Sequence, residues 1–296
     1  MPDLEKLISI IKKRETLVES VPAEFVQQIE NIQNAIYREM LTYAKNLEIS
    51  KAGAILNNDV NKAMTAKLRV QIRKWMRDNG YYRESTEFVK KYGDLLRGAQ
   101  SYYKTMDLSP AFTDRDLATL SKLRATDLNF LHAVDENLIN ITYEECISSI
   151  YAKTDWRDLA ARMKNLHTDT IIRYKGKTKR LNGLLKKYTN TYAFTAYASF
   201  DRQIQNIKAA EFGLDHFLYS GGLVVDSRDF CVARAGNIFT KKEIDSWQSM
   251  SWTGKAAGRD VWKFLGGFNC QHILSPVTDD YADMQTELET LWKKIS

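Results

Sequence analysis

Proline is scarce in this sequence, which has only four among its 296 residues: Pro2, Pro22, Pro110 and Pro276. None lies in the 165 residues between the last two. Because proline ends or kinks helices, long stretches without it favour helical structure. We therefore expect a mainly α chain.

Cysteine is equally rare, and long apolar runs are missing. Cys146, Cys231 and Cys270 are too few and too scattered for a disulfide framework. No apolar run reaches about 18 residues, so we expect no membrane span. The first residues include acids and lack an apolar stretch of signal-peptide length. We interpret them as a first helix and expect the chain to be made and folded in a cytoplasm.

Neither sign of charge dominates the composition. The 43 basic and 37 acidic residues leave a net charge of +6, and 44% of the residues are hydrophobic, as in ordinary globular proteins. This small basic excess is compatible with a polyanionic neighbour, but it does not by itself indicate DNA binding.

The N-terminal half has the periodicity of long helices. A helix start is predicted at 20–24, around Pro22, because the apolar positions after it recur at spacings of three and four. Another helix is predicted to begin at Thr142, which has capping-box spacing to Glu145. A further helix is expected from Asp155 to Leu166.

The pattern changes near residue 170. We expect a short strand and turn at 171–177, a long helix ending before Gly213, and a short helix capped by Thr240. Glycine-rich stretches between them favour strands or loops, and the spacing at 281–296 predicts an amphipathic helix. The predicted parts are long N-terminal helices in a helical region (1–168), a small α+β C-terminal module (169–280) and a terminal helix (281–296).

Residues that carry chemistry gather between 226 and 277. They are Asp226, Arg228, Cys231, Gly236, Asn269, Cys270 and His272. One interpretation is a zinc site in which Cys231, Cys270 and His272 supply thiolate and imidazole ligands, with Asp226 as the fourth. Cys-x-His, however, is not the usual Cys-x₂₋₄-Cys knuckle.

Two other interpretations of this segment are open. In a tightly packed core, glycines let backbones approach closely, and cysteines act as small buried apolar groups. In a catalytic site, Cys270 and His272 would be a nucleophile and its base, but their spacing permits contact without implying activation. The packed core is favoured, so we expect no metal, no cofactor and no catalytic residue.

A basic run lies between the predicted turn and the long helix. Its members are Lys175, Lys177, Lys179, Arg180, Lys186 and Lys187, flanked by Tyr174 and Tyr188. Such a run can neutralise several phosphates of a nucleic acid. It is also typical of a solvated helix face or loop, and the sequence slightly favours this second interpretation.

The order of these elements resembles the C-terminal signature of the Mu-F-like family of bacteriophage minor head, or head morphogenesis, proteins. That signature has a helix with Thr and Asn, an Asp-x-Arg-x-x-Cys/His element, a Gly-containing turn, and an Asn-Cys-Arg-Cys/His-type motif that runs into Pro-Val. The matching positions are 189–192, 226–231, Gly236, 269–272 and 276–277, over about ninety residues. Gln271 stands where the family has Arg, and His272 where Cys is common.

The resemblance implies a structural virion component and not an enzyme. It would be a low-copy protein of the phage head, made in the host cytoplasm, that acts in head assembly and in genome packaging or delivery. Portal or capsid proteins would be its partners, and packaged DNA would be contacted non-specifically. From the residues alone, two alternatives stay open: a nucleic-acid-processing or effector enzyme using Asp226, Cys231 and His272, or a DNA-binding protein using the basic run.

Overall fold

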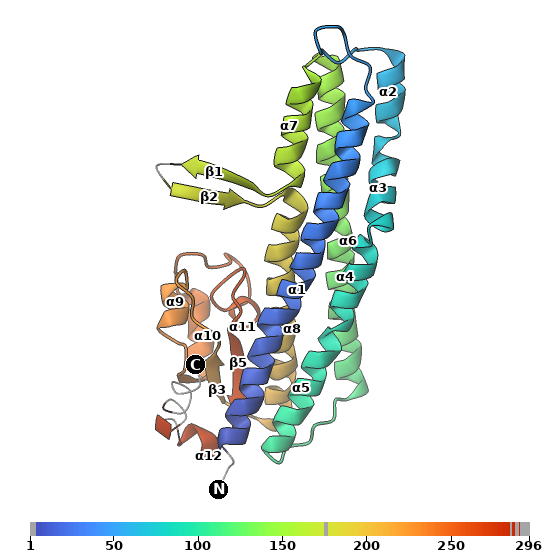
Figure 1. Ribbon diagram of the computed structural model, residues 1–296. Coiled ribbons are helices and arrows are strands. Elements are labelled where there is room, and N and C mark those ends of the chain that lie inside the picture. The colour runs from blue at the N-terminus through green and yellow to red at the C-terminus, as the bar shows by residue number, and fades with distance from the viewer. Residues whose placement is uncertain (1–3, 175–176, 285, 288–289, 291–296) are drawn as a thin grey trace. The chain divides into compact units, whose positions relative to one another are not determined.

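The computed structural model describes residues 4–174, 177–284, 286–287 and 290 (Figure 1). The chain is mainly α, as expected. Its longer helices are α1 (Leu4–Lys45), α2 (Asp59–Ala66), α3 (Leu68–Asp78), α4 (Tyr81–Lys90), α5 (Tyr92–Thr105), α6 (Asp114–Tyr151), α7 (Trp156–His167) and α8 (Leu184–Phe212). Short strands, short helices and loops make up the remainder, and this architecture confirms the predicted fold class.

The chain forms two compact units. One contains residues 1–23, 88–127 and 191–296, and the other contains residues 24–87 and 128–190. Helices α1, α4, α6 and α8 contribute residues to both. These units cut across the division expected at residue 168, because each unit combines segments from both sides of it.

Helix α1 continues through Pro22, so the helix start predicted at 20–24 is wrong. Residues before the proline, Leu7, Ile11 and Val18, are fully buried at helical spacing. An internal proline removes one backbone hydrogen bond and costs roughly 3 kcal/mol. Burial along the whole helix offsets that local cost.

The helix start predicted at Thr142 is also wrong, because Thr142 lies inside α6. Its buried hydroxyl donates to the Leu138 carbonyl at 2.7 Å and lies 2.9 Å from Nε2 of His167. The expected helix at 155–166 is confirmed as α7, and the Asp155 side chain caps it by accepting from the Arg157 amide at 2.8 Å.

The predicted strand and turn near residue 170 form an antiparallel hairpin. Strand β1 (Thr170–Tyr174) pairs with β2 (Lys177–Leu181), in a register that sets Thr170 opposite Leu181. Helix α8 follows and ends before Gly213, whose φ of +64° is the left-handed conformation expected of a helix-ending glycine.

The C-terminal segment folds around a three-stranded antiparallel sheet of order β4-β3-β5. Its strands are β3 (His216–Ser220), β4 (Ile238–Thr240) and β5 (Ile273–Val277). Short helices accompany it: α9 (Asp229–Val232), α10 (Lys241–Ser246), η1 (Trp247–Ser249), α11 (Val261–Phe264) and α12 (Asp279–Ala282) (Figure 1). The capping box predicted at Thr240 is present and begins α10.

The apolar core of this segment is rich in aromatic rings and contains two of the three cysteines. Phe217, Tyr219, Phe230 and Trp247 pack there with Cys231 and Cys270. Of the terminal helix expected at 281–296, residues 285, 288–289 and 291–296 lie outside the described residues. Among the described helices, none is both long and apolar enough to cross a membrane.

Candidate functional site

Cys231, Cys270 and His272 come together in the core around β3. Cys231 lies on α9, and the other two immediately precede β5. The two sulfurs are 4.0 Å apart, and the Cys270 sulfur is 3.7 Å from Nδ1 of His272. All three side chains are buried, with at most 6% of any residue exposed. The structure thus brings together residues 39 positions apart in sequence.

A tight turn before Cys270 makes this approach feasible. A Cβ atom on Gly266 would lie 2.4 Å from the Cys231 sulfur, and one on Gly267 would lie 1.9 Å from the Gly254 carbonyl oxygen. Leu265 and Asn269 also have positive φ angles, of 40° and 61°. The backbone at Gly266 therefore packs directly against the sulfur, and this contact requires glycine.

Arg202, on α8, holds the segment before β5 that carries Cys270 and His272. Its buried guanidinium donates to the backbone oxygens of Cys270 and His272, each at 2.6 Å, and to that of Lys263 at 2.5 Å. These bonds satisfy carbonyl groups that would otherwise be buried without partners. Arg202 therefore fixes the backbone from which the thiol and the imidazole project.

Tyr219, in the central strand β3, is the fourth member of the cluster. Its hydroxyl is 3.3 Å from the Cys231 sulfur and 4.0 Å from the Cys270 sulfur, and its ring centroid is 5.2 Å from that of His272. Gly236 adjoins it, because the Gly236 amide donates to the Tyr219 carbonyl at 2.8 Å. The sequence prediction missed Tyr219, although its two-residue spacing from Phe217 indicates a shared face of a strand.

The buried sulfurs differ in their affinity for a proton. The hydrogen bond between the two sulfurs raises the pKa of Cys231 and lowers the pKa of Cys270; burial adds to the first shift and opposes the second. Burial also raises the pKa of Tyr219 well above its ordinary value. Nε2 of His272 is buried without a hydrogen-bond partner among the described residues. The cluster is therefore a low-dielectric site in which Cys270 loses its proton more readily than Cys231.

The other predicted site residues, Arg228, Asn269 and Asp226, lie outside the cluster of sulfur and imidazole groups. Arg228 donates to the Phe268 carbonyl at 2.7 Å, and the Asn269 amide donates to the Thr195 hydroxyl at 3.0 Å, so both fasten the turn before Cys270. Asp226 is exposed, in a turn closed by a 2.8 Å bond from the Ser227 amide to the Val224 carbonyl. Among the described residues, the cluster with ligand atoms within 4.8 Å of one another is Cys231, Cys270 and His272. The prediction of Asp226 as a fourth ligand is therefore wrong, because its turn faces solvent.

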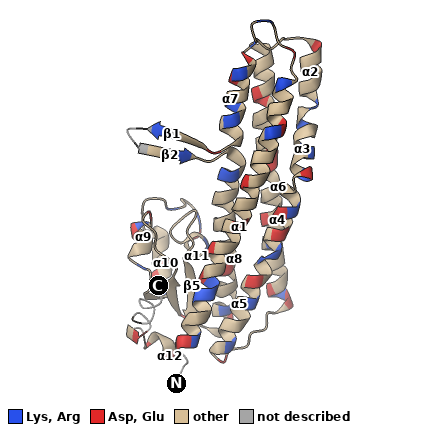
Figure 2. Cartoon of the chain, in the orientation of Figure 1, with Lys and Arg blue, Asp and Glu red and all other residues tan. Residues whose placement is uncertain are grey.

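The members of the basic run whose side chains the structure describes, Arg180, Lys186 and Lys187, have carboxylate or aromatic neighbours. Arg180 and Lys186 both bind Asp169 and Glu30, at distances of 2.5 to 3.2 Å. Lys187 lies 6.0 Å from the ring centroid of Tyr188. Lys177 and Lys179 belong to β2, and Lys175 lies outside the described residues. Figure 2 shows acidic and basic residues interspersed along the helices, so neither sign gathers over them.

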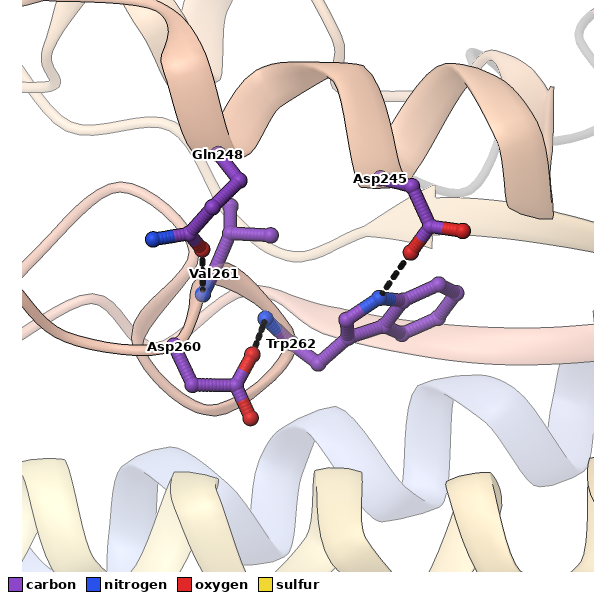
Figure 3. Close-up of a pocket in the computed structure, with 5 residues that line it drawn as sticks. All are labelled: Asp245, Gln248, Asp260, Val261 and Trp262. Carbon is purple, nitrogen blue, oxygen red and sulfur yellow. Dashed lines mark hydrogen bonds between the residues drawn. The ribbon is translucent and has the colours of Figure 1, made fainter.

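A shallow pocket lies beside α10 and α11, lined by Asp245, Gln248, Asp260, Val261 and Trp262. Figure 3 shows that these groups bind one another. The Trp262 indole donates to Asp245 at 2.8 Å, the Trp262 amide to Asp260 at 3.0 Å, and the Val261 amide to Gln248 at 2.9 Å. These bonds hold α11 against α10, which is a structural role.

The buried cluster has the donor atoms for a soft metal ion, and its burial does not suit catalysis on a large substrate. A nucleophilic thiol needs access to its substrate, whereas these sulfurs are almost completely enclosed. Comparison of the chain with protein-family models, curated proteins and solved structures finds no match.

Proposed function

We propose that this chain is a structural component of a bacteriophage head, of the minor head type, that acts in head assembly and in genome packaging or delivery. One observation supports this function most. Several residues that carry the resemblance, namely Arg228, Cys231, Gly236 and those at 269–272, lie in one packed region, although up to 44 positions separate them in the chain. A shared signature whose parts pack together is expected of a common fold element and not of a chance match.

Exposed apolar side chains next to this cluster suit an assembly role. Leu223, Val224 and Val225 precede the Asp226 turn, and Val224 and Val225 are 72% and 104% exposed. Exposed apolar groups gathered in one loop are typical of protein contact surfaces. Portal or capsid proteins are the partners that we propose for this surface.

Non-specific contact with packaged DNA is the second role that we propose. The lysines of the β1–β2 hairpin alternate with other residues along β2, at positions 177 and 179. Lysines bind phosphates without reading base sequence. This role accompanies the structural one and does not need an active site.

Particle composition tests the proposed function. Phage particles produced from the genome that encodes this chain would be purified by density gradient and probed with an antibody against the recombinant protein. We expect a low-copy band that co-sediments with full heads and resists protease until the heads are opened. Detection of the protein only in the soluble fraction of the lysate would contradict the proposal.

A further inference from the structure

We propose that Cys231, Cys270 and His272 bind a structural zinc ion, with the Tyr219 hydroxyl at the fourth corner of its coordination sphere. This inference does not depend on the proposed function. It rests on the positions and burial of four side chains in one core.

Two of the three separations among the sulfur and nitrogen donors match a tetrahedral zinc site, and the third is within 4.8 Å. Zn–S bonds of about 2.3 Å and Zn–N bonds of about 2.0 Å give tetrahedral edges of about 3.8 Å between two sulfurs and about 3.6 Å between sulfur and nitrogen. The observed separations are 4.0 Å between the sulfurs and 3.7 Å from the Cys270 sulfur to Nδ1 of His272. The Tyr219 hydroxyl is 3.3 and 4.0 Å from the two sulfurs, separations that suit a fourth donor.

The charge of this donor set also suits a buried dication. On binding, both thiols lose their protons to solvent, and the two thiolates balance the charge of Zn²⁺, so the occupied site is neutral. A neutral site avoids most of the cost of burying an unpaired charge. Thiolate sulfur and imidazole nitrogen are the usual ligands of structural zinc, and they select it over magnesium or calcium.

The buried imidazole supports a metal more than a purely apolar core. Buried polar groups normally have good hydrogen-bond partners. Among the described residues, Nδ1 of His272 contacts the Cys270 sulfur at 3.7 Å, and Nε2 has no hydrogen-bond partner. A metal ion bound at Nδ1 would replace the long sulfur contact with a strong one, and Nε2 would then carry the proton of the ring. The Arg202 bonds to the carbonyls of Cys270 and His272 hold the backbone of both ligands in place before any ion binds.

The site would be structural because it connects separate elements and is closed to solvent. Its donors come from α9, from β3 and from the segment before β5. An ion shared among them fastens a helix of only four residues, α9, to the sheet. Structural zinc of this kind contributes directly to the free energy of folding.

Elemental analysis of the full chain, purified under reducing conditions without chelators, tests the proposal. We expect about one zinc per chain, and a value close to zero for Cys231→Ser and for Cys270→Ser. The matched control is Cys146→Ser, which alters a buried cysteine in α6 and should keep full zinc. Removal of zinc from the wild-type chain should lower its Tm.

A spectroscopic measurement on the unaltered chain keeps the test independent of variant folding. After removal of zinc, added Co²⁺ should give thiolate-to-cobalt charge-transfer absorption and the strong visible bands of a four-coordinate ion. Two results would overturn the proposal: no bound metal together with no cobalt spectrum in the reduced protein, or a Cys231–Cys270 disulfide, seen as a mass lower by two hydrogens.

Discussion

Arg14 and Asp201 form a buried two-point ion pair. Nε of Arg14 donates to one carboxylate oxygen at 3.2 Å and Nη2 donates to the other at 2.7 Å, with both side chains at most 1% exposed. A third guanidinium nitrogen donates to the hydroxyl of Ser275 in β5 at 3.1 Å. Three elements, α1, α8 and β5, therefore meet at one cation.

Replacement of Asp201 by Asn should destabilise the chain strongly, because it leaves the Arg14 charge buried without its counter-ion. Loss of one partner of a buried pair costs about 3–5 kcal/mol. Urea unfolding followed by circular dichroism measures this loss. The control Glu136→Gln removes a half-exposed pair with Arg73 and should cost less than about 1 kcal/mol. Equal losses in the two variants would show that the Arg14–Asp201 pair is not buried as described.

His167 should make the fold sensitive to mild acid. Burial lowers its pKa from 6.5 to about 4. Between these two values the unfolded chain takes up a proton that the folded chain does not, so the free energy of unfolding falls as pH decreases from about 6.5 to about 4. The full effect is at most about 3 kcal/mol. The variant His167→Gln keeps every other titrating group of the wild type. The difference in free energy of unfolding between the two proteins should therefore change with pH over this range. Parallel plots of that free energy against pH would contradict the prediction.

Gly266→Ala should destabilise the core, because its Cβ would lie 2.4 Å from the Cys231 sulfur. Overpacking of this kind costs about 1–3 kcal/mol. Gly93→Ala is the matched control in α5, where the nearest neighbour of an added Cβ, an Arg97 nitrogen, is 3.5 Å away. It should be neutral or stabilising by up to about 1 kcal/mol. Thermal melts of the two variants measure the change in Tm relative to the wild type. An unchanged Tm for Gly266→Ala would show that the turn is looser than described.

Binding of the chain to double-stranded DNA should weaken steeply with salt and be indifferent to sequence. A plot of log K against log salt concentration has a negative slope, and each lost phosphate contact reduces the steepness of that slope by about 0.9. Replacement of Lys175, Lys177 and Lys179 by Gln should therefore flatten the slope. The double variant Arg180→Gln/Lys186→Gln should not, because Asp169 and Glu30 already neutralise these cations. Fluorescence anisotropy at several salt concentrations measures both, and a preference for one sequence would contradict this account.

Removal of residues 285–296 should prevent incorporation into particles and leave the remaining chain folded. The spacing of Leu288, Leu291, Trp292 and Ile295 predicts an apolar helix face, and such a face can seat one protein in the groove of another. The cut keeps Tyr281, which is buried in α12. Quantitative blotting of purified heads measures incorporation. Full copy number of the shortened chain would show that this segment is not the anchor.

Periodicity and capping in the sequence predicted much of the helical structure, and they failed where burial outweighs a local signal. Pro22 is a strong start signal, yet buried residues at helical spacing precede it and keep α1 continuous. Thr142 and Glu145 have capping-box spacing, but the Thr142 hydroxyl binds within the helix and next to His167. A local signal such as a proline or a capping box describes a segment in isolation, whereas tertiary packing decides whether the helix begins there.

The candidate site was predictable in part. The order of motif residues indicated that Cys231, Cys270 and His272 belong together. Arg202 could not be predicted, because an arginine in a long helix has no sequence mark that distinguishes a buried position from an exposed one. Asp226 was misplaced because nearness to Cys231 in sequence does not fix the direction of an exposed turn.

The noncontiguous make-up of the two units also has a genetic consequence. The C-terminal segment shares its unit with residues 1–23 and 88–127, and the Tyr102 hydroxyl donates to the Pro276 carbonyl at 2.6 Å. A single recombination crossover near codon 169 would therefore join the C-terminal segment of one lineage to the N-terminal helices of another, so the two sides of such contacts would come from different lineages. Exchange between related genes should preserve folding only when the whole reading frame is inherited together.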